Sequence, residues 1–120
     1  MGDKPGDGIN AWLVSFQEES GSVSHEYHML LKGTDFTLAE TACELMGGSW
    51  WHPERPINTQ GCYWQFDQGS AWLKSIVLLD DREDDTLTGL RFLDEWFVTG
   101  TPDAPLICDR SGNRWEDYRP

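Results

Sequence analysis

The sequence predicts a single α+β domain, with a mainly antiparallel sheet built from hairpins and two helices packed on it. Three observations support this prediction. Alternating apolar and polar residues recur in paired runs around turn-forming residues, a pattern typical of β-hairpins. Two other segments carry helix start signals and apolar residues at helical spacing. The length of 120 residues fits one domain, which we expect to span residues 9–120 after a flexible polar tail at residues 1–8.

The first two strands are predicted on either side of a glycine-containing turn. Residues 9–17 alternate between apolar and polar side chains, and residues 23–31 do the same. The intervening residues 18–22 (EESGS) are typical of a turn. Two runs of period two around such a turn predict a β-hairpin.

A helix is predicted after this hairpin. Thr37 and Glu40 have the spacing of a capping box, in which each side chain satisfies a free backbone N–H group at the helix start. Apolar residues then recur at helical spacing: Leu38, Ala42, Leu45 and Met46. We expect Gly47 and Gly48 to end the helix, because glycine readily adopts the left-handed conformation that follows many helices.

A second hairpin is predicted after a long irregular segment. Residues 49–61 contain two prolines and an Asn-Thr-Gln-Gly run, which argue against a regular element there. Residues 62–66 and 71–79 have strand character and surround a turn at residues 67–70. The second of these strands is apolar on both faces. We therefore expect it to be a central strand covered on both sides, or part of a subunit interface.

The next segment begins with a dense acidic run. Five of the six residues from Asp80 to Asp85 are carboxylates, and carboxylates favour the N-terminus of a helix because of its dipole. We therefore predict a helix from this run to about Val98. Its apolar residues cover a wider arc than a surface helix needs, so we expect deep burial or contact with a second chain. They are Leu87, Leu90, Phe92, Leu93, Trp96 and Phe97.

A third short hairpin completes the predicted fold. Residues 106–108 and 114–118 flank residues 109–113, where Gly112 or Asn113 can supply the positive φ angle of a tight turn. The expected element order is therefore ββα-ββα-ββ.

Charge is the strongest functional signal in the composition. The chain has 21 acidic and 9 basic residues and a formal net charge of −12. Direct binding to nucleic acid or to an anionic membrane requires Lys and Arg, so we expect neither and favour a basic protein partner. A solvated acidic surface without a partner is the alternative. Neither a signal peptide nor a membrane-spanning apolar stretch is recognisable, so we expect a cytoplasmic protein.

Metal sites are not expected. His25 and His28 are three residues apart in a predicted strand, so they point to opposite faces, with His25 inward and His28 outward near Glu26. The other candidate zinc ligands are Cys43, His52, Cys62 and Cys108. Their spacing matches no usual zinc motif, and we expect buried, inert thiols.

The acidic run has a superficial likeness to a calcium-binding loop. Asp81, Glu83 and Asp85 have the alternate spacing of the first three ligands of an EF-hand. The sixth position, however, is Thr86 where that loop needs glycine, and the twelfth is Phe92 where it needs glutamate. We therefore expect no calcium site and no cofactor.

The sequence contains no GxSxG, P-loop or GxGxxG motif. His52 lies in the predicted loop near Glu54 and is a candidate general base. It supports the alternative hypothesis of a small enzyme or ligand-binding domain. Trp50 and Trp51 in the same loop suggest another role: one would anchor the loop and the other would be exposed, and an exposed tryptophan is a frequent hot spot at protein interfaces. The alternative is that both pack under the loop.

We expect a small acidic non-enzymatic binding protein that blocks a basic protein surface. It would act as an inhibitor, an immunity protein or a nucleic-acid mimic directed at a nuclease or a nucleic-acid-binding complex. The expected partner-binding residues are Asp80, Asp81, Glu83, Asp84, Asp85, Trp50 and Trp51. A third hypothesis is an oligomeric assembly protein, with a homodimer formed through the predicted second helix or fourth strand.

Overall fold

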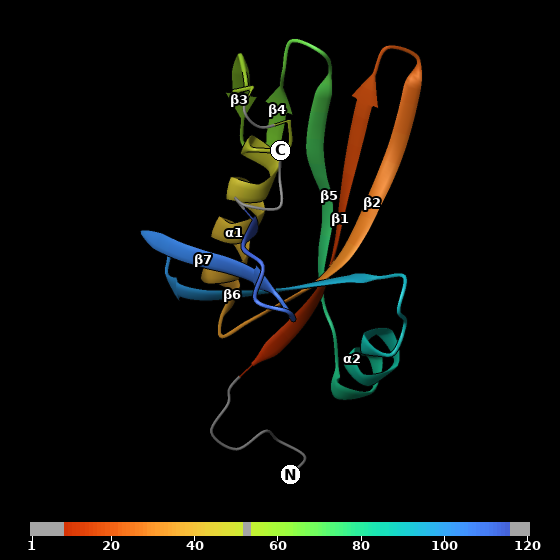
Figure 1. Cartoon of the computed structure of the whole chain (residues 1–120), viewed down its shortest axis with the longest axis vertical. Helices are drawn as coiled ribbons and strands as arrows, with labels where there is room; N and C mark the ends of the chain where they lie inside the picture. The colour runs from red at the N-terminus through yellow and green to blue at the C-terminus, as the bar shows by residue number, and fades with distance from the viewer. Residues whose placement is uncertain (1–8, 52–53, 116–120) are drawn as a thin grey trace.

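A seven-stranded mixed sheet and two helices make up the fold (Figure 1). The computed structural model describes residues 9–51 and 54–115. The strands are β1 (Asn10–Ser20), β2 (Val23–Gly33), β3 (Asn58–Gln60), β4 (Tyr63–Gln65), β5 (Ser70–Leu78), β6 (Asp94–Thr101) and β7 (Ala104–Asp109). The helices are α1 (Phe36–Gly48) and α2 (Asp81–Thr88). The predicted α+β class is confirmed, and the expected tail at residues 1–8 lies outside the described residues.

The strands follow the spatial order β3-β4-β5-β1-β2-β6-β7. The sheet is mainly antiparallel as predicted, but β2 and β6 run parallel, with Met29 opposite Asp94. The observed element order is ββα-βββα-ββ. The predicted order is therefore met only in part, because β3 forms within the segment 49–61 that was expected to be irregular.

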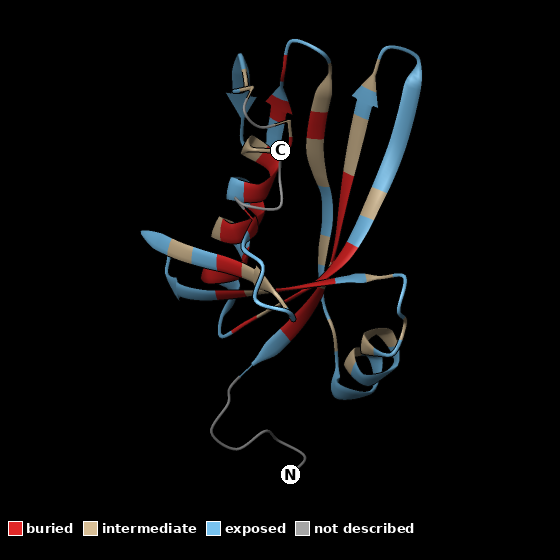
Figure 2. Cartoon of the chain, viewed as in Figure 1, coloured by how far each residue is buried: buried red, intermediate tan, exposed pale blue. Residues whose placement is uncertain are grey.

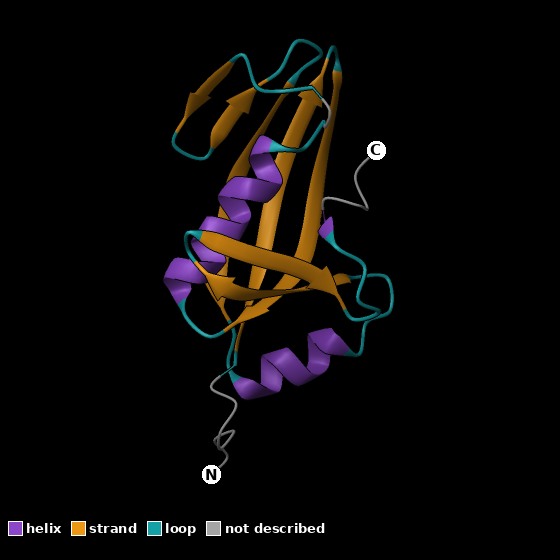
Figure 3. Cartoon of the chain, turned by 60° about the vertical axis from the view of Figure 1, so that its left-hand side comes forward, coloured by secondary structure: helices purple, strands orange, loops and turns teal. Residues whose placement is uncertain are grey.

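The sheet curls around α1. Figure 3 shows β6 and β7 crossing α1 on one side while the long strands run along its other side. Consistently, α1 contacts β2, β4, β5, β6 and β7. The buried residues of α1 face the space inside this curl: Leu38, Ala39, Ala42, Cys43, Met46 and Gly47. Figure 2 shows that buried residues are concentrated along α1 and the strand segments around it.

The first two predicted hairpins are confirmed. β1 and β2 pair along their whole length, and Gly21 in the turn between them has a φ angle of +63°. β4 and β5 pair on either side of the predicted turn at residues 67–70. Both hairpins can be predicted because alternating apolar and polar residues and turn-forming residues lie next to each other in the sequence.

The third hairpin differs from its prediction. β7 pairs along its length with β6, while the expected pairing with residues 114–118 is reduced, within the described residues, to a bridge between Cys108 and Arg114. Gly112 has a φ angle of +88°, so it supplies the positive φ of this turn. Residues 116–118 lie outside the described part of the chain.

The predicted second helix is wrong beyond Thr88. Gly89 is the C-cap of α2, and the segment that follows enters β6 at Asp94. Trp96 and Val98 are both buried in the core, and residues two apart share one side in a strand but not in a helix. The apolar residues of this segment fit both helical and strand spacing. Pairing with β2 therefore decides that the segment forms a strand.

Of the two helices in the described part of the chain, only α1 has residues buried in the core. α2 has no buried residue, so the prediction that two helices pack on the sheet is wrong for α2. In the described ranges, neither helix has the length and apolar character that a membrane crossing requires.

The ends of α1 also differ from the prediction. The N-cap is Asp35 rather than Thr37, and its carboxylate accepts a hydrogen bond from the Leu38 N–H at 2.8 Å. Gly47 is part of the helix and has no positive φ angle. A different reason explains glycine there: a Cβ atom on Gly47 would lie 2.1 Å from the Trp64 indole ring.

We expect Gly47→Ala to lower the free energy of unfolding by about 1–3 kcal/mol, because the added methyl group overlaps the buried indole. Gly48→Ala is the matched control. Its Cβ atom would lie 3.5 Å from the nearest Trp64 atom, an ordinary contact, so the better helix propensity of alanine should keep or raise stability. Urea denaturation of both variants measures the difference. Equal effects would contradict the close approach of Gly47 to Trp64.

β5 is not covered on both faces. Ala71 near its start is buried, but Val77 and Leu78 near its end are 51% and 61% exposed. The prediction of a strand buried on both sides is therefore wrong for this end of β5. The alternative, that this strand contributes to a subunit interface, stays a prediction.

Candidate functional site: acidic helix α2 and the adjoining cleft

Helix α2 begins within the acidic run, as predicted. Asp80 is its N-cap, and its side chain accepts a hydrogen bond from the Glu83 N–H at 2.7 Å. The Glu83 side chain in turn accepts one from the Asp80 N–H at 2.9 Å. This capping box satisfies two backbone donors, and Asp81, Glu83 and Asp84 in the first turn favour the helix dipole. Part of the acidic run therefore has a local structural role.

Lys32 on β2 connects α2 to the sheet. Its Nζ atom lies 3.3 Å from an Asp84 carboxylate oxygen and donates to the Thr88 hydroxyl at 3.0 Å. The Thr88 hydroxyl itself donates to Asp84 at 3.0 Å. Because α2 has no buried residue, these polar contacts are its principal attachment to the strands among the described residues.

A buried carboxylate lies beneath this attachment. The Glu95 side chain on β6 is only 5% exposed and lies between two cations. One of its oxygens is 2.6 Å from Lys32 Nζ, and the other is 2.6 Å from Arg110 Nη2. A buried charge of this kind is tolerated when it is paired on both oxygens. Sequence reasoning missed Glu95 and Lys32 because their partnership depends on the parallel pairing of β2 with β6.

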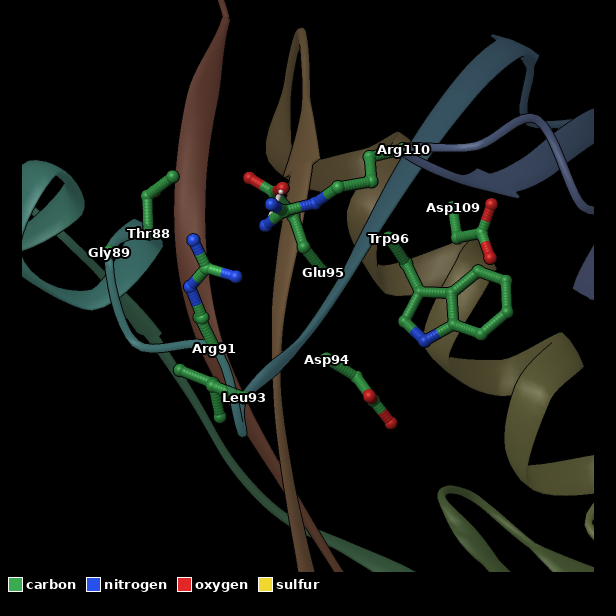
Figure 4. Close-up of a pocket in the computed structure, with 9 residues that line it drawn as sticks. All are labelled: Thr88, Gly89, Arg91, Leu93, Asp94, Glu95, Trp96, Asp109 and Arg110. Atoms are coloured by element: carbon green, nitrogen blue, oxygen red, sulfur yellow. Dashed lines mark ion pairs between the residues drawn. The ribbon is translucent and has the colours of Figure 1, made fainter.

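A cleft of about 560 Å³ lies beside this charge cluster, between the end of α2 and strands β6 and β7. Its lining residues are Thr88, Gly89, Arg91, Leu93, Asp94, Glu95, Trp96, Asp109 and Arg110 (Figure 4). In Figure 4, the Arg110 guanidinium lies at the Glu95 carboxylate, and Arg91 enters the cleft from a different segment. This volume lies within the range of small-ligand sites.

The acidic side chains of the cleft have partners within the chain. Asp94 accepts a hydrogen bond from the Tyr27 hydroxyl. Asp109 accepts from the backbone N–H groups of Ser111 and Asn113, each at 2.9 Å, and from the Asn113 side chain at 3.1 Å. Hydrogen bonding by the Asn113 side chain, with support from these backbone N–H groups, lowers the pKa of Asp109.

Exposed apolar residues flank α2. Val77 and Leu78 precede its N-cap, and Phe92 follows its C-terminus with 83% of its surface exposed. We call the carboxylates Asp80, Asp81, Glu83, Asp84 and Asp85 together with Phe92 the α2 surface. This surface combines charge with an exposed aromatic ring, and the second feature was not predicted, because Phe92 was expected inside a helix.

The two tryptophans expected at the partner surface lie elsewhere. Trp50 is 5% exposed and packs in the core, with ring centroids 5.0 Å from Phe16 and 5.5 Å from Tyr27. Trp51 is half-buried and makes an edge-to-face contact with Phe66 at 5.1 Å. Trp50 therefore cannot act as an exposed anchor. Figure 1 places the end of α1, which these residues follow, far from α2.

The loop proposed for the enzyme alternative is described only in part, because His52 lies outside the described residues. Glu54 accepts a hydrogen bond from the Asp67 N–H at 3.0 Å and does not line the cleft beside α2. The cleft and the tryptophan loop are thus separate features of the described structure.

The histidines and cysteines form no metal cluster among residues 9–51 and 54–115. His28 lies 3.3 Å from Glu26 as predicted and shares a hydrogen bond with Ser15. His25 was expected to face inward but is exposed. All three cysteines are free, with Cys43 buried and the other two half-buried.

Cys43 should be inert in the folded protein. Burial raises its pKa to about 12, with smaller contributions from Cys62 and from Glu40 and Glu44 on the same helix. At pH 8 only about one thiol in ten thousand would then be ionised. We expect a thiol-specific reagent to label Cys43 only after unfolding, as mass spectrometry of digested protein can measure. Fast labelling of Cys43 in the native state would contradict this burial.

Comparison with known proteins returns no relatives: no family model, no curated protein and no solved structure matches the chain.

Proposed function

We propose that the protein is a small non-enzymatic binding protein whose α2 surface blocks a basic surface of another protein. It would act as an inhibitor, an immunity protein or a nucleic-acid mimic. The observation that carries this proposal is that α2 has no buried residue although five carboxylates lie on it or at its N-cap. Such a helix contributes little to the core, and helix capping accounts for only part of its acidic composition.

Charge and apolar contact have different roles in this proposal. The net charge of −12 attracts a basic partner over long range and speeds association. Phe92 supplies an exposed aromatic ring, and aromatic residues are enriched at protein interfaces. Trp50 has no part in this surface because it is buried, and Trp51 packs against Phe66.

A nucleic-acid mimic would present carboxylates in place of phosphates. Asp81 and Asp85 are the members of the α2 surface best suited to this role, because both are exposed and neither forms the capping box. Asp80 and Glu83 form the capping box, and Asp84 pairs with Lys32 on β2.

Charge reversal tests this proposal. The variant Asp81→Lys/Asp85→Lys is compared with Glu40→Lys/Glu44→Lys, which changes two exposed carboxylates of α1 and shifts the net charge equally. Pull-downs from lysate should recover a basic protein in a salt-sensitive manner. The α2 variant should lose this protein, the α1 variant should retain it, and excess DNA should compete if the partner binds nucleic acid. Equal behaviour of the two variants would refute a specific role for α2.

The exposed end of β5 favours a second candidate function, self-association. Val77 and Leu78 are exposed apolar residues at the end of β5, and a second copy could cover one of the faces on which they lie. Light scattering at increasing concentration should show a dimer that Val77→Ser/Leu78→Ser disrupts. A monomer at every concentration would exclude this role.

A further inference from the structure

The cleft beside α2 concentrates positive charge within an acidic protein. Arg91 and Arg110 both line it, and Lys32 lies behind it in contact with Glu95. The described part of the chain has only seven Lys and Arg residues in total: Lys32, Arg55, Lys74, Arg82, Arg91, Arg110 and Arg114. Three of these seven therefore gather at one site, although the chain as a whole has a large excess of carboxylates.

Hydrogen-bond partners decide which of these charges remain available. Both carboxylate oxygens of Glu95 are engaged, one by Lys32 and the other by Arg110. Asp109 is engaged by the turn that follows it, and Asp94 by Tyr27. The hydrogen-bond acceptors of the cleft are thus largely occupied by donors of the protein itself.

The hydrogen-bond donors of the cleft, in contrast, are largely available to a ligand. Arg91 makes no hydrogen bond or ion pair with any described residue, so all of its five N–H donors are available. Arg110 reaches Glu95 through one nitrogen, Nη2, and its side chain is 59% exposed. The Glu95 ion pair also restrains the Arg110 guanidinium at the cleft, which lowers the entropy lost when a ligand binds.

We propose that this cleft binds a small oxyanion, a carboxylate or phosphate group, through Arg91 and Arg110. A guanidinium group presents parallel N–H donors that match both of these groups. Leu93 lines the same cleft and offers apolar contact to the rest of the ligand. The proposal does not depend on the α2 surface, because neither arginine belongs to it.

The acidity of the chain predicts an unusual salt dependence for this site. Long-range repulsion by a net charge of −12 opposes an anion, and salt screens that repulsion more than it screens a close guanidinium–oxyanion pair. Affinity should therefore change little, or rise, with moderate salt. The proposed partner of the α2 surface should instead bind more weakly under the same conditions.

The experiment is a titration of the full chain followed by NMR, using the backbone amides of residues 89–96 and the indole N–H signals. The probes are inorganic phosphate, succinate and a phosphoserine peptide. We expect saturable shifts with at least one probe. Arg91→Gln should weaken binding by about tenfold, which corresponds to about 1.4 kcal/mol for the loss of charge-assisted hydrogen bonds. Arg82→Gln, an exposed α2 arginine that does not line the cleft, is the matched control.

Each outcome decides between defined alternatives. Equal binding of free phosphate or succinate and of the peptide assigns the site to small molecules, and tighter binding of the peptide assigns it to a phosphorylated partner. Shifts that never saturate, or an unchanged affinity in Arg91→Gln, would overturn the proposal. Thermal unfolding of each variant confirms that the fold is retained. Asp81→Lys/Asp85→Lys should still bind the oxyanion, so failure of the α2 proposal and failure of this one are distinguishable.

Discussion

Replacing Trp50 with alanine should lower the free energy of unfolding by about 3–5 kcal/mol, because it removes a large buried ring and leaves a cavity. The ring is 5% exposed and lies within 5.5 Å of both Phe16 and Tyr27 by ring centroids. It also neighbours Trp115, so its loss weakens contacts between the end of α1 and the last described residues. Urea denaturation followed by circular dichroism measures the loss.

Trp51→Ala is the matched control for Trp50→Ala. The same side chain is removed, but Trp51 is half-buried, and among the described residues its aromatic partner is Phe66. We expect a loss of about 1–2 kcal/mol, in proportion to the smaller apolar area exposed. A larger loss for Trp51 than for Trp50 would show that the burial order of the two tryptophans is wrong.

Lys32→Met should lower the free energy of unfolding by about 3 kcal/mol, because it leaves buried Glu95 with one cation instead of two. The same change removes the contacts of Lys32 with Asp84 and Thr88. Amide hydrogen exchange within α2 should therefore accelerate more than exchange in α1. Lys74→Met, which breaks the exposed ion pair with Glu26, is the control and should change stability by about 0.5 kcal/mol or less.

A second substitution separates the buried charge from lost side-chain contacts. Adding Glu95→Leu to Lys32→Met removes the uncompensated carboxylate and replaces it with an apolar group, which is often neutral for stability. Arg110 is left without Glu95 but remains hydrated, because 59% of its side chain is exposed. We expect the double variant to recover most of the loss. If the stability losses of Lys32→Met and Glu95→Leu simply add, Lys32 stabilises the fold through contacts other than that with Glu95.

Several elements follow from signals within a few residues. The hairpin of β1 and β2 is recognisable because alternation surrounds a short turn with glycine, and Gly21 has the positive φ angle that such a turn uses. The start of α2 is recognisable because Asp80 and Glu83 cap it. In each case the determining contacts join residues close in sequence, so a local pattern is sufficient.

Other local signals are compatible with more than one structure. Thr37 and Glu40 match a capping box, yet Asp35 caps α1. The apolar residues after α2 match helical spacing, yet Trp96 and Val98 belong to β6 and the core. A segment that satisfies two periods adopts the one that buries more apolar surface against its neighbours.

The acidic character of the chain and the position of its acidic helix start are properties of the sequence, because composition and capping chemistry are local. The cleft is a property of the tertiary structure. Lys32, Glu95 and Arg110 meet only because β2 lies parallel to β6 and β7 follows as its neighbour. No pattern within a short window specifies which strands become neighbours, since that choice depends on the burial of the whole core.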